Sequence, residues 1–182
     1  DYGTATGIDF TLENRGMLIN TMLQYTYSVA KANGAYDASA FGGQYVDAPS
    51  QQYLMPFDRT HDLALSLYTS LPLGINASMT HFYQSGFPYT PSIQKGGESS
   101  TDWIEDPFNK YGKRSEAYKK INVSLSKAVA YKNFSISLGL NVLNLYSTEN
   151  HLAVWPITGD AEDPGTYYTD EIGLPADGGF LS

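Results

Sequence analysis

Large apolar and small polar side chains alternate along much of this chain. The alternation holds over six segments, and none of them carries a 3.6-residue helical repeat. A period of two residues is typical of a β-strand whose two faces meet different surroundings. We therefore expect an all-β protein, with strands at about 2–13, 17–30, 60–71, 75–87, 120–129 and 134–142.

Short and long connections alternate between these segments. Residues 13–16, 72–74 and 130–133 predict hairpin turns, whereas 31–59, 88–117 and the stretch from 148 onward are long excursions. A type I turn at Pro72 and Leu73, with Gly74 left-handed, would make a three-residue hairpin loop. Leu71 then pairs with Ile75 and Leu67 with Met79, which keeps the apolar residues of both strands on one face.

The polar half of the pattern is unlike the water-exposed face of a soluble sheet. It consists nearly entirely of Ser, Thr, Asn, Gln and Gly, and charged residues make up only 16% of the chain. Soluble sheets normally place Lys, Glu and Arg there. Segments of this length match the ~9–11 residues that a tilted strand needs to cross a bilayer. The pattern therefore favours an antiparallel, up-and-down transmembrane β-barrel over a soluble sandwich.

Aromatic residues strengthen this prediction, since the chain has 15 tyrosines. On the apolar face, Tyr25, Tyr27, Tyr83 and Phe87 fall near long-loop ends and Phe134 near a short turn. Two such groups would form the aromatic girdles of the two membrane interfaces. We expect short turns on the periplasmic side and long loops on the extracellular side of a Gram-negative outer membrane.

Composition and motifs exclude several other functions. The net charge of −8 argues against nucleic-acid binding, and the absence of cysteine excludes disulfides and thiolate chemistry. No catalytic constellation or cofactor fingerprint occurs, so we expect neither an enzyme nor a cofactor. Three histidines, His61, His81 and His151, lack metal-ligand spacing, and the acidic run 159–171 lacks the spacing of a calcium-binding EF-hand. The sequence therefore predicts no metal site, and calcium binding by the acidic run through Asp160, Glu162, Asp163 and Asp170 stays open as an alternative to a solvated loop.

Four residues are candidates for ligand contact. Asp62, Phe82 and Gln84 lie on the polar parity near a long-loop end, where they would line the route of a ligand. Trp103 lies among acidic residues of the excursion 88–117. The alternative interpretation of Trp103 is that this aromatic side chain packs against its own loop and contacts no ligand.

Several short motifs resemble the C-terminal strands of TonB-dependent outer-membrane receptors. The Arg-x-His-Asp strand opening reads Arg59, His61 and Asp62, and the Ser-Gly-x-Pro-Tyr-Thr-Pro exit spans 85–91. A Val-x-Asn-Leu strand end reads Val142, Asn144 and Leu145. The segment LQYTYSVAKA at 23–32 is similar to the Tyr-Thr-Tyr strand of these receptors, and the likeness covers most of 1–150.

The resemblance implies a 22-stranded barrel with an N-terminal plug domain, of which residues 1–182 would be a C-terminal portion of about six strands. Plug and final strand would lie outside these residues. Its implied function is uptake of a scarce nutrient, such as a siderophore, vitamin, oligosaccharide or peptide, powered through TonB. The implied partners are outer-membrane lipid, the rest of the barrel and plug, the TonB complex and the extracellular nutrient.

Two alternatives remain open. One is a passive porin or adhesin barrel, and the other is a soluble β-sandwich that binds carbohydrate. Barrel and sandwich differ in whether the apolar face meets lipid or a second sheet. In a barrel, Leu138→Lys would oppose insertion by ~2–4 kcal/mol, whereas Ser137→Lys would be tolerated.

Overall fold

A computed structural model describes residues 2–33, 52–95, 102–167 and 170. The described chain is built of antiparallel β-structure, which confirms the all-β prediction. None of its helices is long and apolar enough to cross a membrane. Six long strands dominate: β1 (Tyr2–Arg15), β2 (Ile19–Asn33), β4 (His61–Leu71), β5 (Ile75–Gln84), β10 (Tyr118–Tyr131) and β11 (Phe134–Val142).

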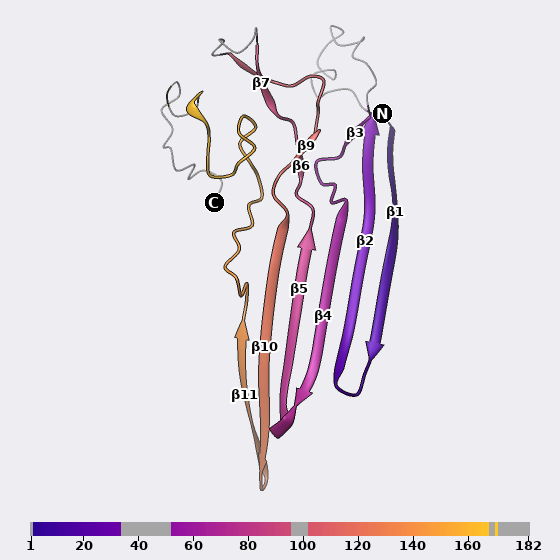
Figure 1. The fold of residues 1–182 in the computed structure, drawn as a ribbon, viewed down its shortest axis with the longest axis vertical. Helices are drawn as coiled ribbons and strands as arrows, with labels where there is room; N and C mark the ends of the chain where they lie inside the picture. Colours follow the sequence, from indigo (N-terminus) through magenta and orange to yellow (C-terminus); the bar gives the residue numbers. More distant parts are fainter. Residues whose placement is uncertain (1, 34–51, 96–101, 168–169, 171–182) are drawn as a thin grey trace.

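The long strands form one sheet in the order β1-β2-β4-β5-β10-β11, so each strand pairs with the next long strand along the chain (Figure 1). β3 (Tyr53–Leu54) adds two residues beside β2. The excursions contain two further small pairs, β6 (Pro88–Tyr89) with β9 (Lys113–Arg114) and β7 (Ser92–Gln94) with β8 (Trp103–Glu105). The excursions were expected to lack periodic structure, and these short pairs refine that expectation.

Strand pairing keeps the apolar parity on one face throughout. The predicted pairs Leu71 with Ile75 and Leu67 with Met79 are both present. The same row continues from Met79 to Val123 on β10 and on to Val142 on β11. Every other long strand is in step with this row, so all six place their apolar residues on the same face of the sheet.

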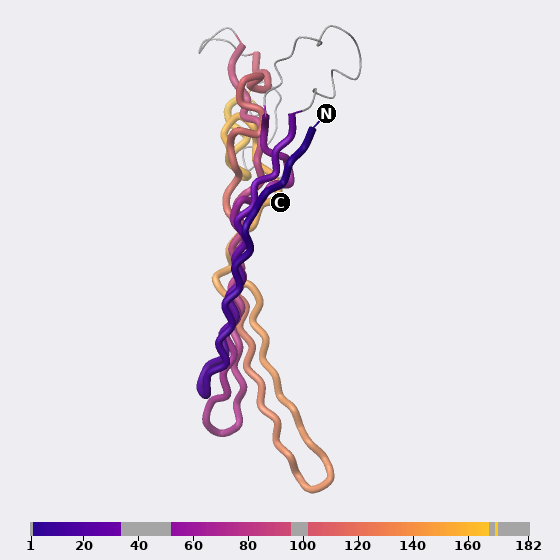
Figure 2. The backbone as a smooth tube through the Cα atoms, turned by 90° about the vertical axis from the view of Figure 1, so that its right-hand side faces the viewer, coloured from indigo at the N-terminus to yellow at the C-terminus, as the bar shows by residue number. Residues whose placement is uncertain are grey.

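The six-stranded sheet is a single layer, as the edge view shows (Figure 2). None of the residues in its long strands is buried. Within the described residues, the buried positions lie in the excursions instead, among them Asp58, Ser85, Ala161 and Pro164. The described chain thus has a compact loop region above a sheet that is open on both faces.

The first predicted turn was wrong. We expected it at 13–16, but β1 runs to Arg15, and Gly16 N–H donates to the Ile19 carbonyl at 3.3 Å, so the tip is Met17 and Leu18. Asn-Arg-Gly has turn chemistry, yet strand pairing extends through it. Glu13 and Arg15 stay two residues apart on the polar face, where they form an ion pair of 2.8 Å.

The second and third turns differ in detail from the prediction. The loop Pro72–Gly74 has the predicted length, but Leu73 has a φ of 67° as well as Gly74 at 70°. Tight hairpin turns often use left-handed residues, because the twist of such turns matches the twist of the paired strands. The Leu73 side chain is 80% exposed, so packing against other residues does not oppose this conformation. β10 and β11 pair as far as Tyr131 and Phe134, which leaves a two-residue turn.

Candidate functional site

The apolar face extends across all six long strands of the described sheet. Its side chains are strongly exposed on the edge strands, as at Ile8 (72%), Leu138 (69%) and Leu140 (59%), and partly exposed on the central strands. No described residue forms a second layer over it (Figure 2). The face includes Ile8, Phe10 and Leu12 of β1, Ile19, Leu23, Tyr25, Tyr27 and Val29 of β2, Leu63, Leu65, Leu67 and Leu71 of β4, Ile75, Met79 and Tyr83 of β5, Ile121, Val123, Leu125, Val129 and Tyr131 of β10, and Phe134, Ile136, Leu138, Leu140 and Val142 of β11.

The aromatic residues predicted for the long-loop end gather there, with one exception. Tyr25 and Tyr83 flank Leu63 in one cross-strand row, and Tyr27 pairs with His61 in the next. The Tyr25 hydroxyl and His61 Nδ1 lie 2.8 Å apart. Phe87 is the exception, because β5 ends at Gln84 rather than at 87. At the opposite end, the rings of Tyr131 and Phe134 contact each other at a tilt of 53°, with a centroid distance of 5.3 Å.

The polar face carries a row of hydrogen-bonding side chains near its long-loop end. Asp9, Thr26, Asp62 and Gln84 are consecutive cross-strand neighbours. Thr26 Oγ1 donates to Asp9 Oδ1 at 2.6 Å, and Gln84 Nε2 donates to Asp62 Oδ2 at 2.7 Å. Parity predicted Asp62 and Gln84 on this face but not the hydrogen bond between them, and Asp9 and Thr26 were missed because their proximity depends on the register between strands.

The four predicted ligand residues do not form one site. Asp62 and Gln84 are bonded to each other, and Phe82 lies on the same face, opposite Ala64 and Lys120 in the next row. Trp103 instead belongs to β8, where it pairs with Gln94 of β7 in a separate two-stranded sheet. Three of the candidates therefore share one surface, and Trp103 lies apart from them.

A buried ion pair ties the loop region to the sheet. Asp58, only 2% exposed, accepts hydrogen bonds from Ala30 N–H at 2.6 Å, from Thr60 Oγ1 at 2.9 Å and from Arg114 Nη2. Arg114 Nη1 donates to the carbonyls of Asp58 at 3.1 Å and Gly86 at 2.9 Å. The pair joins segments 56 residues apart, so no local pattern could have revealed it.

The electrostatics of this ion pair follow from its contacts. Burial by itself would raise the pKa of the Asp58 carboxyl. Hydrogen bonds from Arg114, Ala30 and Thr60, together with the charge of Arg114, outweigh burial and hold that pKa below its ordinary value of 3.8. Asp58 is therefore a carboxylate at neutral pH, and its charge is balanced by Arg114.

Contacts at the exit of β5 show why the Ser-Gly-x-Pro motif has Ser and Gly at its first two positions. Ser85 Oγ accepts from His61 N–H at 3.0 Å, and Ser85 N–H donates to the His61 carbonyl at 2.8 Å. A Cβ on Gly86 would lie 1.9 Å from the Ser115 carbonyl oxygen, which no side chain tolerates. Backbone and side chain of Ser115 both bond to Phe87, at 2.9 Å each. The motif thus packs the exit of β5 tightly against the start of β10.

Asparagine side chains fix the chain that follows the C-terminal end of β11. Asn144 has a φ of 53°, its N–H donates to Asn122 Oδ1 at 3.1 Å, and its Oδ1 accepts from Thr148 N–H at 3.2 Å. Asn150 bonds to both the N–H and the carbonyl of Lys119, at 2.8 and 3.0 Å. Past Val142 these side chains replace a paired strand along β10.

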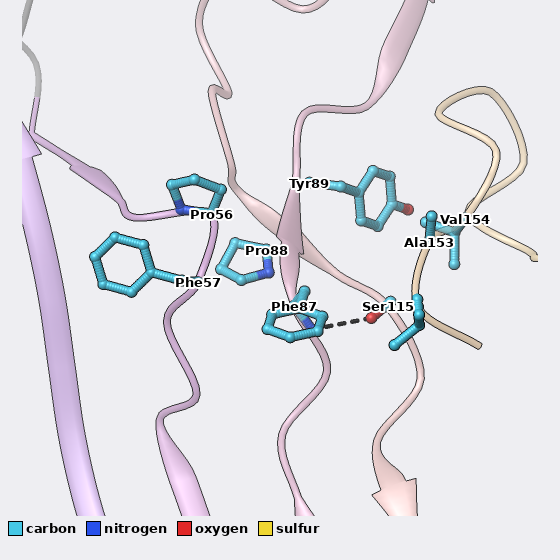
Figure 3. A pocket seen from close by; sticks show the side chains of 9 residues that line it. Pro56, Phe57, Phe87, Pro88, Tyr89, Ser115, Ala153 and Val154 are labelled. Carbon is cyan, nitrogen blue, oxygen red and sulfur yellow. Dashed lines mark hydrogen bonds between the residues drawn. The ribbon is translucent and has the colours of Figure 1, made fainter. Parts of the chain in front are cut away.

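An apolar cleft of about 390 Å³ lies in the loop region (Figure 3). The Tyr89 ring points toward Ala153 and Val154, and burial raises the pKa of its hydroxyl. Arg59 lies 4.0 Å from the centroid of the Phe87 ring, which also lines the cleft. The lining residues are Pro56, Phe57, Phe87, Pro88, Tyr89, Ser115, Leu152, Ala153 and Val154.

The sequence did not predict one cluster of carboxylate and imidazole side chains. Glu149, His151 and Glu162 place their ligand atoms within 4.8 Å of one another. A hydrogen bond with Glu149 and the charge of that residue raise the pKa of Glu162. Two of the three members are exposed carboxylates, a common surface arrangement, so the cluster alone carries no metal assignment. Asp160 and Asp163 of the acidic run instead accept from the N–H groups of Glu162 and Gly165, at 2.8 Å each.

Comparison of the chain with protein-family models, with curated proteins and with solved structures gave no match.

Proposed function

We propose that this chain forms part of the wall of an outer-membrane β-barrel that belongs to a TonB-dependent nutrient transporter. One observation carries the membrane-wall part of the proposal: a six-stranded antiparallel sheet with a continuous apolar face on one side and a hydrogen-bonding face on the other. In the proposed barrel, lipid covers the apolar face and the polar face lines the interior.

The cost of exposing the apolar face to water supports a lipid covering. Roughly twenty large apolar side chains lie on it, and burying one fully is worth about 1.5–3 kcal/mol. Even if each side chain were only half buried by a covering, leaving the face in water would lose on the order of 20 kcal/mol of stabilising free energy. Since whole domains are stable by only about 5–15 kcal/mol, the sheet needs a covering. A sandwich would have to draw its second sheet from outside the described residues.

Strand length is consistent with a membrane span. The ten residues of β5, the second shortest of the long strands, extend about 33 Å at 3.3 Å per residue. Tilted by about 40°, such a strand rises about 25 Å, the height of the apolar band of an outer-membrane barrel. The longer strands β1, β2 and β10 continue into the proposed extracellular rim or periplasmic turns.

The polar face supports a water-filled interior. At its short-turn end it is hollowed into a concavity of about 360 Å³, lined by Glu13, Asn14, Arg15, Asn20, Thr21, Met22, Ser66, Leu67, Tyr68, Ser78 and Thr80. Most of these side chains can be solvated by water, and Glu13 and Arg15 form an ion pair, although Met22, Leu67 and Tyr68 add apolar surface. Together with the row that contains Asp62 and Gln84, they would line the barrel from one end to the other.

The assignment to TonB-dependent transport rests on the motif resemblance. The Arg59, Ser85–Gly86 and Asn144 motifs each make specific contacts where strands meet loops. In the proposed protein, the rest of the barrel pairs with the free edges of β1 and β11, and a plug domain occupies the interior. A nutrient enters from the extracellular side, and the TonB complex acts on the plug.

Spin labels can test which medium each face meets. The chain has no native cysteine, so a nitroxide can be placed singly at Leu67→Cys on the apolar face and at Ser66→Cys, its neighbour on the polar face. In the full-length protein in vesicles, we expect the label at 67 to collide readily with oxygen but poorly with a water-soluble nickel chelate. The label at 66 should collide with nickel.

A sandwich gives a different result, because a label at 67 would be shielded from both oxygen and nickel by the second sheet. That outcome would refute the barrel. The same variants thus separate a membrane wall from a soluble binding module.

Energy dependence separates active transport from the passive porin alternative. In cells expressing the full-length protein, accumulation of its nutrient should cease when an ionophore collapses the proton gradient of the inner membrane. Uptake that persists unchanged under the ionophore would assign the barrel to passive diffusion.

A further inference from the structure

Carboxylates are confined to one face of the six-stranded sheet, whereas cations lie on both, with Arg15 and Lys120 on the polar face. The three carboxylates of the sheet, Asp9, Glu13 and Asp62, all lie on the polar face. The apolar face carries three lysines, Lys31, Lys119 and Lys127, and within the described strands no carboxylate. In a chain of net charge −8, a face that bears only cations points to an anionic partner.

Two of these lysines lie the same number of residues from the short turn of their own hairpin. Leu18 and Lys31 are 13 residues apart, and so are Lys119 and Lys132, where Leu18 and Lys132 each belong to the turn of their own hairpin. Thirteen residues extend about 43 Å, or about 33 Å above the turns at a tilt of about 40°. That height exceeds the ~30 Å hydrocarbon core of a bilayer. Both ammonium groups would therefore lie at the level of lipid headgroups.

Neither lysine is neutralised within the described part of the chain. The ion pairs found there use Arg15, Lys95, Arg114 and His151. Lys31 is exposed and lies between Thr4 and Leu54, and Lys119 is exposed beside Tyr83. On β2, Tyr25 and Tyr27 lie between Lys31 and the apolar band, and Lys119 lies in the same cross-strand row as Tyr25 and Tyr83, so both lysines are next to the proposed aromatic girdle.

We propose that Lys31 and Lys119 bind the phosphate groups of anionic lipids around the barrel at its long-loop end. The inference rests on the proposed membrane span and adds a lipid preference to it. Lysines close to an anionic membrane surface are attracted to it, whereas lysines in the barrel interior are not. Lys127 lies five residues before the β10–β11 turn and extends its stem toward the opposite interface, so it is not part of this band.

Spin-labelled lipids measure such a preference directly. The full-length protein is reconstituted in phosphatidylcholine vesicles with trace spin-labelled phosphatidylglycerol or phosphatidylcholine. The fraction of label held at the protein surface gives the relative association of each lipid. Since one lysine near the surface attracts anionic lipid by about fivefold at most, we expect phosphatidylglycerol to be preferred by about two- to fivefold.

Lys119→Gln and Lys120→Gln form a matched pair. They remove the same charge from adjacent residues of β10, one on each face. Lys119→Gln should lower the preference, and Lys31→Gln combined with Lys119→Gln should abolish it, whereas Lys120→Gln should leave it unchanged. The preference should also vanish in ~1 M salt, which shortens the screening length to about 3 Å.

The outcomes separate this inference from the proposed function. If neither lipid shows a surface-held fraction, the protein does not span the membrane and both proposals fail. If both lipids are held equally by the wild-type protein, the membrane span stands and the lipid inference is overturned. An undiminished preference in the Lys31 and Lys119 double variant would also overturn it.

Discussion

A lysine placed on the apolar face measures how deep each position lies in the proposed membrane. Leu67 is the most informative site. It lies in the row of Met79, Val123 and Val142, six residues before the centre of the β4–β5 loop. Six residues rise about 15 Å at a tilt of about 40°, which is half the thickness of a ~30 Å core. Leu67 would therefore lie at the midplane.

Depth fixes the expected cost. We expect Leu67→Lys to lower the free energy of unfolding of the full-length protein by about 2–4 kcal/mol, and Leu71→Lys, beside the turn, by about 0–1 kcal/mol. Ser66→Lys faces the interior and should cost little. Urea titration of the protein folded in vesicles gives all three values. Equal costs at 66 and 67, or a greater cost at 71 than at 67, would refute the reasoning.

The register also shows why Leu67 is preferable to Leu138, the position suggested by the alternation alone. Leu138 is the cross-strand partner of Lys127. A lysine at 138 would meet a like charge directly opposite, which is destabilising in any sheet. Its effect would therefore mix charge repulsion with the cost of lipid exposure.

Three further predictions concern the loop region, each measured on the full-length protein. Arg114→Met leaves Asp58 buried and unpaired and should destabilise by about 3–5 kcal/mol in urea unfolding, whereas Arg15→Met, at an exposed ion pair, should cost at most about 1 kcal/mol. Because the pKa of the Asp58 carboxyl is lowered on folding, its ionised form stabilises the protein above pH 3.8, and this stabilisation is lost as the pH falls through the folded-state value. The thermal unfolding temperature of Asp58→Asn should therefore fall less with acidification below pH 3.8 than that of the wild-type protein. An equal fall in both proteins would count against the ion pair. Gly86→Ala sets a Cβ against the Ser115 carbonyl and should destabilise by more than about 2 kcal/mol, while Gly139→Ala, with 3.9 Å of room, should be tolerated.

The alternation predicted the strands and their faces well, because a period of two is a local property. One turn was enough to set the register of its hairpin: three residues between Leu71 and Ile75 leave a single pairing that keeps both apolar sets together. Turn propensity alone gave the wrong position for the first turn, because pairing with β2 extends β1 through Asn14 and Arg15, which favour turns together with Gly16.

The site was only partly predictable. Asp62 and Gln84 were identified because parity and closeness to a long loop place both on the polar face. Asp9 and Thr26 join them only through pairing between β1 and β2, and Arg114 reaches Asp58 across the whole loop region. Contacts between distant segments depend on how the loops close, for which an alternating pattern carries no information.

The order of strand pairing has a kinetic consequence. Hairpins β1–β2, β4–β5 and β10–β11 are closed by turns of two or three residues, whereas pairing of β2 with β4 and of β5 with β10 must wait for closure of long excursions. Short hairpins form in microseconds, and each of these three already has its apolar face complete. The sheet can therefore grow by adding finished two-strand units, so that an error in joining two units would leave the inner register of each unit intact.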